Sequence, residues 1–536
     1  MHCCLELSAR CESGLDLWHV FKRLWVWLAF VCLFAVALPG WAFAATGARA
    51  AVLVNAITLQ GNSQYSETRL RALYATQLGT RLSLEQLRAI AARIQDFYKD
   101  NGFLLTRVII PKQDFADGHP VEMVVLEGRL AAIEVNHAER YRAERIRQFI
   151  HNAGLQIGRP FKFNDLRRAI ALLNLQAGIQ VTTKLRAGQE RGYTDLVVDV
   201  HPQPLFAGSA ELNNFGSSHT GRDRAMSTLS MSNATGLGDQ LNLLGLYSFG
   251  QGNAYFARMD YKLPINTDGT SVEAFASGGN IHVGRQLQVL NIRGRSVSLG
   301  WGIAQAQVLS PESILSYHAF LQGTDLRQEI LGTVVSRDRV RKLRIGALFT
   351  NRGPFSRTQL DLDVHRGLGP TLGAMANDSP NSSRPGADDR FTRITVDMIR
   401  VQQLLPRLEL IPSLTGQYAF DPLVTGEQYT IGGAYSIRGQ ASAAYSGDSG
   451  YTATLEVRYN VLSSGVLQAI GQISHGRVFV KNTWAAASSS HGLSGLDIGL
   501  RAEPIDHLIL RADVGIPVGP QSGDSNYWYG KVSYVF

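Results

Sequence analysis

One arginine has a sequence setting that predicts a structural role. Arg438 lies in the run Gly432-Gly433-Ala434-Tyr435-Ser436-Ile437-Arg438-Gly439-Gln440, where glycines on both sides let the backbone turn sharply. An arginine folded into a poorly hydrated interior requires an acidic partner, because an unpaired buried charge is costly. The chemistry expected of this segment is therefore charge pairing that holds a loop in place. The alternative is that Arg438 is an ordinary exposed loop residue.

Bond-making chemistry has no comparable signature. The sequence contains no H-E-x-x-H, no G-x-S-x-G, no phosphate-binding loop and no G-x-G-x-x-G. Its 13 histidines are scattered, and all four cysteines lie at or before Cys32. The net charge of +8 is modest for 536 residues and gives no indication of nucleic-acid binding. We therefore expect no catalytic residue, no cofactor, no metal site and no nucleic-acid partner.

Residues 1–44 have the pattern of a signal peptide. Lys22 and Arg23 precede an apolar run that ends at Leu38, and Ala42-Phe43-Ala44 forms a small-residue cleavage site. Cleavage after Ala44 would leave an exported chain without cysteine, which suits an oxidising periplasm. The alternative is an uncleaved membrane anchor, although the apolar run is short for a span of ~20 residues.

The elements that would position Arg438 are strands, because apolar and polar residues alternate from residue 206 to the end. Residues 451–459 are a clear example, with apolar odd positions and polar even positions. Sixteen such segments are expected: 206–214, 223–233, 239–248, 254–263, 270–280, 294–304, 314–323, 341–352, 355–365, 390–402, 408–419, 449–460, 466–478, 493–502, 507–515 and 526–536. An even number of strands returns both ends to one side of a membrane. Loops 366–389 and 420–448 are then expected outside the cell, and short turns at 352–354 and 503–506 in the periplasm.

The C-terminus decides between a soluble sandwich and a membrane barrel. Trp528, Tyr534 and Phe536 share one face of the last expected strand, and the chain ends on an aromatic residue. This ending resembles the sorting signal of bacterial outer-membrane barrels. The alternative is an ordinary edge strand that ends on Phe536 by chance. We predict a transmembrane β-barrel of 16 antiparallel strands over residues 206–536, with apolar side chains outward and polar ones in the lumen.

Before the barrel, two units repeat the order β-α-α-β-β, at residues 52–128 and 129–204. In the first unit, strands are expected at 52–59, 104–110 and 121–126, and helices at 66–77 and 83–100. A sheet edge left uncovered by the helices can accept an extended peptide through main-chain hydrogen bonds. In the second unit, Arg142 and Arg145 lie on the first expected helix, where they would steer a client or simply form a solvated face.

Several segments resemble the two-partner secretion transporters (TpsB), the outer-membrane exporters of haemolysins and filamentous adhesins. Residues 98–113 and 121–128 are similar to the family's first POTRA (polypeptide-transport-associated) domain, and residues 173–174 and 192–198 to its second. Residues 213–216, 220–221 and 236–239 are similar to the barrel entrance, and Ile437-Arg438-Gly439-Gln440 to a hallmark loop in the lumen. The fold implied is two periplasmic α+β POTRA domains before the barrel, with residues 420–448 folded into its lumen. The function implied is export of an unfolded partner with an N-terminal secretion domain, by a monomeric barrel in outer-membrane lipid.

The sequence departs from the family at two positions. Gln440 replaces the tyrosine of the hallmark loop, and Ser474 replaces the aspartate that the family pairs with the loop arginine. Strand parity places three other acids in the lumen, Glu456, Asp497 and Asp513. Asp497 is favoured slightly as the partner of Arg438, because its strand neighbours the one that carries Ser474.

Two other functions compete with secretion. A barrel-assembly factor of the same superfamily would have a similar architecture, but such factors commonly carry more than two POTRA domains. A passive porin would have no use for about 150 residues of client-binding domains. The sequence therefore favours secretion and leaves the identity of the exported partner open.

Overall fold

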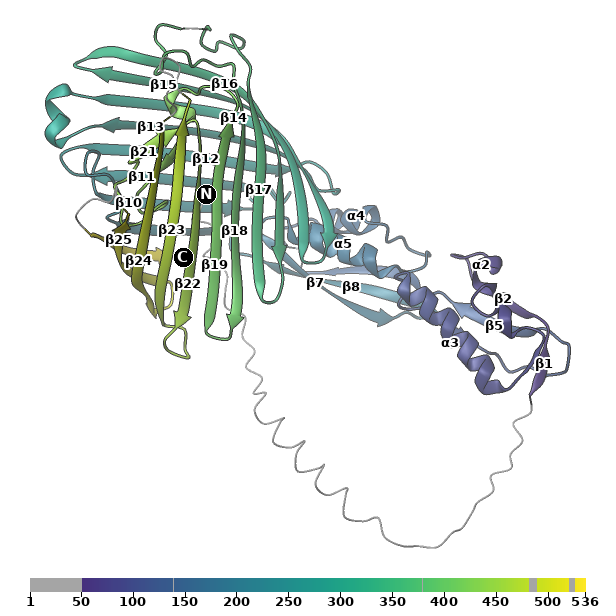
Figure 1. The fold of residues 1–536 in the computed structure, drawn as a ribbon. Coiled ribbons are helices and arrows are strands. Elements are labelled where there is room, and N and C mark those ends of the chain that lie inside the picture. The colour runs from purple at the N-terminus through teal and green to yellow at the C-terminus, as the bar shows by residue number, and fades with distance from the viewer. Residues whose placement is uncertain (1–50, 138, 378, 482–488, 520–525) are drawn as a thin grey trace, which may run out of the picture.

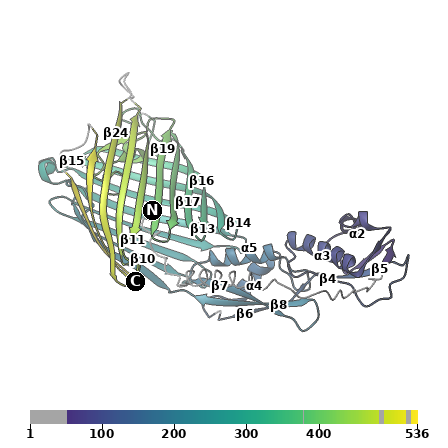
Figure 2. The ribbon, with the colours of Figure 1, turned by 60° about the horizontal axis from the view of Figure 1, so that its bottom comes forward.

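The computed structural model describes residues 51–137, 139–377, 379–481, 489–519 and 526–536 (Figure 1). The signal peptide expected at 1–44 lies outside the described residues. Within the described ranges, no helix has both the length and the apolar character needed to cross a membrane. Two small α+β units form an arm that extends from one end of a large barrel (Figures 1 and 2).

Sixteen antiparallel strands close into the barrel, as the alternation predicted. In chain order they are β9 (Phe206–Asn213), β10 (Asp223–Ser232), β11 (Gln240–Phe249), β12 (Asn253–Pro264), β13 (Thr270–His282), β14 (Arg293–Ser310), β15 (Ser313–Ile330), β16 (Thr333–Arg352), β17 (Ser356–Gly367), β18 (Thr392–Leu405), β19 (Leu408–Ala419), β22 (Ser449–Asn460), β23 (Leu467–Val480), β24 (Ser489–Ile505), β25 (Leu508–Val518) and β26 (Tyr527–Val535). Each pairs with the next along the chain, and β26 returns to β9. The predicted fold class is confirmed.

The strand limits differ most from expectation in β14 to β16 and at the end of β24. Strands β14, β15 and β16 are 18, 18 and 20 residues long, so they run well beyond the segments of about ten residues that alternation indicated. The turn expected at 503–506 lies further along, because β24 continues to Ile505 through a register shift that accommodates Pro504. His507, in the left-handed region at φ 74°, makes the turn instead.

The barrel wall is apolar outside and polar inside. On β17, Leu360, Leu362 and Val364 are exposed, whereas Asp361 and Asp363 between them are buried in the lumen. A soluble β-sheet would bury the apolar face, so this inverted arrangement is the one that lipid requires.

The first arm unit, at the far end from the barrel, has a three-stranded sheet in the order β2-β5-β4. Its elements are β1 (Val52–Val54), β2 (Ile57–Gln60), α2 (Glu67–Arg71), the 3-10 turn η2 (Ala75–Gln77), β3 (Thr80–Leu82), α3 (Leu84–Asp100), β4 (Arg107–Ile109) and β5 (Val121–Leu126). The helix expected at 66–77 is therefore shorter than predicted, and the strand expected at 52–59 is two strands. The longer helix, α3, begins at a capping box of Ser83 and Gln86.

The second unit follows the predicted β-α-α-β-β order, with a sheet in the order β6-β8-β7. Its elements are β6 (Arg129–Asn136), α4 (Ala143–Asn152), α5 (Phe163–Asn174), β7 (Ile179–Ala187) and β8 (Tyr193–Pro202). Phe149 and Leu196 lie in its core and are fully buried. The two units meet closely, because the Phe163 amide donates to the Gly102 carbonyl and Leu105 of the first unit packs on the core of the second.

Candidate functional site

The loop between β19 and β22, residues 420–448, folds back into the lumen. It carries a short hairpin of β20 (Tyr429–Ile431) and β21 (Tyr445–Gly447), and β21 lies against β23. Ile431 and Ile437 are completely buried against Val478 of β23 and Leu493 of β24. The loop therefore packs against a small apolar patch on the otherwise polar inner wall of the barrel.

Glycines let the loop tip touch the barrel wall. Gly439 has φ +84°, and a Cβ there would lie 2.6 Å from the backbone carbon of Ile516. On the wall, a Cβ at Gly495 would lie 1.9 Å from the Arg438 carbonyl oxygen, and one at Gly515 would lie 2.4 Å from the Gly439 nitrogen. A side chain at any of these positions would push the loop away from the wall.

Arg438 is buried at the tip of the loop between two acids and two rings. Its Nη1 lies 2.7 Å from Asp513 Oδ2 and 3.5 Å from Asp497 Oδ2. Its guanidinium lies over the rings of Phe215, at 5.5 Å, and Tyr529, at 5.1 Å. The side chain is only 7% exposed, so these contacts replace most of its hydration.

The pairing extends into a larger network on the same wall. Arg511 bonds Asp513 through Nε at 2.8 Å and approaches Glu456 at 3.4 Å. Arg458 in turn holds Glu456 at 2.5 Å. The network therefore contains three arginines and three carboxylates, and its formal charges balance. Removing one member leaves an opposite charge buried without full compensation.

Two protein-family models match this chain. Residues 192–502 match the family of haemolysin secretion/activation proteins ShlB/FhaC/HecB. Residues 52–128 match the POTRA domain of ShlB type. The chain belongs to the ShlB/FhaC/HecB family. It is therefore an outer-membrane transporter of two-partner secretion, with its POTRA domains in the periplasm.

Individual relatives agree with the family. The heme/hemopexin transporter protein HuxB of Haemophilus influenzae (strain 86-028NP) is 25% identical over 483 residues, covering 85% of this chain and 83% of HuxB. The outer membrane transporter CdiB of Dickeya dadantii (strain 3937) is 24% identical, covering 74% of this chain and 69% of CdiB. The solved structure of CdiB from Escherichia coli has the same fold, with a TM-score of 0.76 and 19% identity. The match covers 98% of this chain and 100% of the CdiB chain.

Within this family architecture, two of the three expected lumen acids pair with Arg438. The favoured Asp497 lies 3.5 Å from the guanidinium, and Asp513 lies nearer, at 2.7 Å. Glu456 contacts Arg458 and Arg511. Parity correctly indicates that all three acids face inward, but it gives no depth along the lumen, and depth decides which acid meets the loop.

The two residues that depart from the family pattern have other contacts. Ser474 is buried, and its Oγ donates to the Gly495 carbonyl at 3.4 Å. Gln440 is also buried, and its amide donates to the Ser494 carbonyl at 2.8 Å. Both therefore contact the segment of β24 against which the loop tip lies.

A second anchor near the start of the loop was missed in the sequence. Glu427 accepts from Lys342 of β16 at 2.7 Å, and Arg393 of β18 lies 2.8 Å from the same carboxylate. Asp448 at the other end of the loop pairs with Arg384 and accepts from the Leu423 amide at 2.7 Å. Parity places Lys342 and Arg393 in the lumen, but nothing in the sequence connects them to a loop acid.

The second POTRA domain docks on the periplasmic turns of the barrel, and this changes the interpretation of its arginines. Arg145 donates to the Pro264 carbonyl at 3.1 Å, and Asn152 donates to Thr267 at 2.6 Å. The Gly238 backbone approaches Tyr141 and Gln176. Neither alternative expected for Arg145, a client-steering rim or a solvated face, describes it, because its guanidinium contacts the barrel. Arg142 precedes α4 and is exposed.

The C-terminal residue closes the barrel seam. Phe536 exchanges two backbone hydrogen bonds with Gly208 of β9, at 2.8 and 2.9 Å. A Cβ at Gly208 would lie 2.7 Å from the Phe536 ring, so the ring covers the glycine. Trp528 and Tyr534 are exposed on the outer surface, as expected for residues that face lipid.

Proposed function

We propose that this transporter exports one unfolded partner protein through a lumen that the 420–448 loop obstructs at rest. The observation that carries the proposal is the double anchorage of this loop, at Glu427 near its start and at Arg438 at its tip. Because the loop is held by ion pairs and not by a covalent bond, charged groups of the client and water entering the lumen can replace these contacts. Release of the tip would then open the path.

The proposed domain limits follow the sequence assignment: a signal peptide at 1–44, POTRA domains at 52–128 and 129–204, and the barrel at 206–536. The partner would carry an N-terminal secretion domain, and the barrel would act as a monomer in outer-membrane lipid. The chain would need no cofactor and would make or break no covalent bond.

Client capture is proposed to occur at the edges of the POTRA sheets. The orders β2-β5-β4 and β6-β8-β7 leave two outer strands in each sheet with one edge unpaired within the sheet. An extended peptide can add to such an edge through main-chain hydrogen bonds, with little demand on its sequence. This suits a partner that must remain unfolded until it reaches the surface.

Deleting residues 52–128 is expected to abolish export while leaving the barrel intact. The barrel's main-chain hydrogen bonding closes on itself, so the barrel does not need the first POTRA domain to fold. Export is measured by co-expressing a candidate secreted partner and recovering it from the medium, and folding by the heat-modifiable mobility of the barrel. If a folded deletion variant still exports the partner, the first POTRA domain is not needed for export. If no candidate partner requires this chain for its export in the same assay, barrel assembly or passive diffusion would be favoured instead.

Phe536 is proposed to act as the sorting signal as well as the last residue of the seam. Its deletion is expected to reduce the folded barrel in the outer membrane severalfold, because the ring over Gly208 and both terminal hydrogen bonds are lost. Quantitative blotting of heat-modifiable protein in outer-membrane fractions measures this loss. Phe536→Tyr keeps the aromatic ring and serves as the matched control. Unchanged barrel levels after the deletion would contradict a sorting role.

A further inference from the structure

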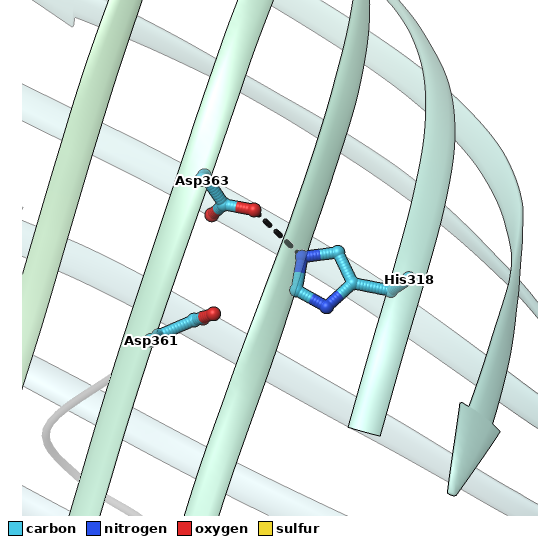
Figure 3. Close-up of side chains that lie close together, drawn as sticks. All are labelled: His318, Asp361 and Asp363. Atoms are coloured by element: carbon cyan, nitrogen blue, oxygen red, sulfur yellow. Dashed lines mark hydrogen bonds and ion pairs between the residues drawn. The ribbon is translucent and has the colours of Figure 1, made fainter. Parts of the chain in front are cut away.

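Three side chains that the transport proposal does not use meet on the lumen wall (Figure 3). They are His318 of β15 and Asp361 and Asp363 of β17, and their ligand atoms all lie within 4.8 Å of one another. No sequence pattern indicates this cluster, because His318 and Asp363 are 45 positions apart. The strand register brings them together, since Gly346 of β16 pairs with His318 on one side and with Asp363 on the other.

The glycine between the two strands makes the meeting possible. A Cβ at Gly346 would lie 2.1 Å from Asp363 Oδ1 and 2.7 Å from His318 Nε2. No side chain fits in that space, so the polar groups of β15 and β17 meet directly over the backbone of β16. His318 Nε2 and Asp363 Oδ1 are 2.6 Å apart.

Asp361 is the residue that points to a ligand. It is only 8% exposed, and its Oδ1 has no hydrogen-bond partner among the described residues. Its carboxylate points towards the His318 ring (Figure 3). Register places Asp397 of β18 directly across from it, which adds a further acid beside this carboxylate. A buried carboxylate oxygen without a donor is costly, and a cation would satisfy it.

We propose that His318, Asp361 and Asp363 bind a divalent transition-metal ion of the zinc class. Zinc takes imidazole nitrogen and carboxylate oxygen at about 2.0–2.2 Å, and three protein ligands leave a fourth position for water. The imidazole favours zinc over magnesium or calcium, which prefer all-oxygen sites. Arg344, whose Nη1 lies 3.8 Å from Asp363 Oδ2, would orient that ligand from outside the coordination sphere.

Binding would exchange one hydrogen bond for metal bonds. His318 Nε2 must be unprotonated to ligate the ion, so any proton that Nε2 shares with Asp363 is released when the metal enters. The ion would then tie β15 to β17 across β16. This places a metal crosslink in the wall several strands away from the acids that hold Arg438.

The test uses the full-length transporter, purified in detergent without a histidine tag and freed of metal by a chelator. Zinc binding is measured by competition with a chromophoric chelator, and bound zinc is counted by mass spectrometry. We expect about one zinc per chain, with affinity reduced at least about tenfold by His318→Gln and by Asp361→Asn, because each removes one ligand. His365→Gln is the matched control, since His365 is buried on the same face of β17 and bonds Thr395.

Thermal unfolding provides a second measurement on the same variants. Asp361→Asn removes the charge of a buried carboxylate whose Oδ1 has no donor among the described residues, so without metal it is expected to unfold at a higher temperature than the unmodified chain. Added zinc is expected to stabilise the unmodified chain and His365→Gln but not Asp361→Asn. The proposal is overturned if the unmodified chain binds no stoichiometric zinc, if it prefers calcium or magnesium, or if Asp361→Asn binds zinc as tightly.

Discussion

Replacing Arg438 with alanine is expected to reduce export strongly and to raise the ion conductance of the barrel. The substitution removes the only side chain of the loop with a described ion pair to Asp513 and Asp497, and it leaves these buried carboxylates with Arg511 alone. Breaking one side of a buried charge pair costs ~3–5 kcal/mol, and hydration of the lumen lowers that figure. Single-channel recording in planar bilayers measures the conductance, and partner recovered in the medium measures export.

Arg501→Ala is the matched control for this experiment. Arg501 lies on β24 of the same wall and donates to Gln468 at 3.1 Å, away from the loop. We expect it to leave both conductance and export near their normal values. Equal effects of the two substitutions would show that the loss of any lumen arginine suffices, and would contradict a specific anchoring role for Arg438.

Glu427→Gln is expected to destabilise the start of the loop and the barrel wall behind it. Glu427 is the acid between Lys342 and Arg393, and without its charge a buried lysine and a half-buried arginine remain close together. The expected loss is again ~3–5 kcal/mol, the typical cost of an uncompensated buried charge. The barrel should unfold at a lower denaturant concentration. Its heat-modifiable mobility serves as the measure of how much barrel remains folded.

The double variant Lys342→Met with Glu427→Gln separates charge balance from loss of contacts. It removes one cation and one anion, so the net charge of the three residues stays at that of the unmodified chain. Replacing both members of a buried pair is often nearly neutral, whereas removing one is not. We expect the double variant to recover much of the lost stability. A double variant that is less stable than Glu427→Gln would contradict the charge explanation.

The barrel could be predicted from the sequence because lipid imposes a simple pattern. Every wall residue faces either lipid or lumen, so alternation such as Leu360-Asp361-Leu362-Asp363 marks a strand directly. Alternation does not mark where a strand ends once it leaves the membrane, which is why the outer parts of β15 and β16 and the periplasmic end of β14 were missed. The helix expected at 66–77 was too long because apolar spacing does not distinguish an α-helix from a 3-10 turn.

The site was only partly predictable, because its contacts join segments that are distant in sequence. Arg438 could be found from its glycine-rich setting, and parity gave the correct face for Asp513. The choice among the lumen acids, the Glu427 anchor and the docking of Arg145 on Pro264 depend on depth and register between strands. Those quantities are set by how the barrel closes, which no local pattern in the sequence records.

Thiol labelling on intact cells tests most directly whether the loop obstructs the lumen at rest and leaves it during export. All four cysteines lie at or before Cys32, so Gln440→Cys introduces a single thiol into the part of the chain that forms the barrel. Gln440 is 5% exposed, whereas Val289, in the outer loop after β13, is 81% exposed and supplies the control Val289→Cys. With a bulky impermeant reagent, we expect Gln440→Cys to react slowly in idle cells and much faster while the partner is exported, with Val289→Cys fast throughout. Rapid labelling of Gln440→Cys in idle cells, or export without any increase in its labelling, would contradict the account.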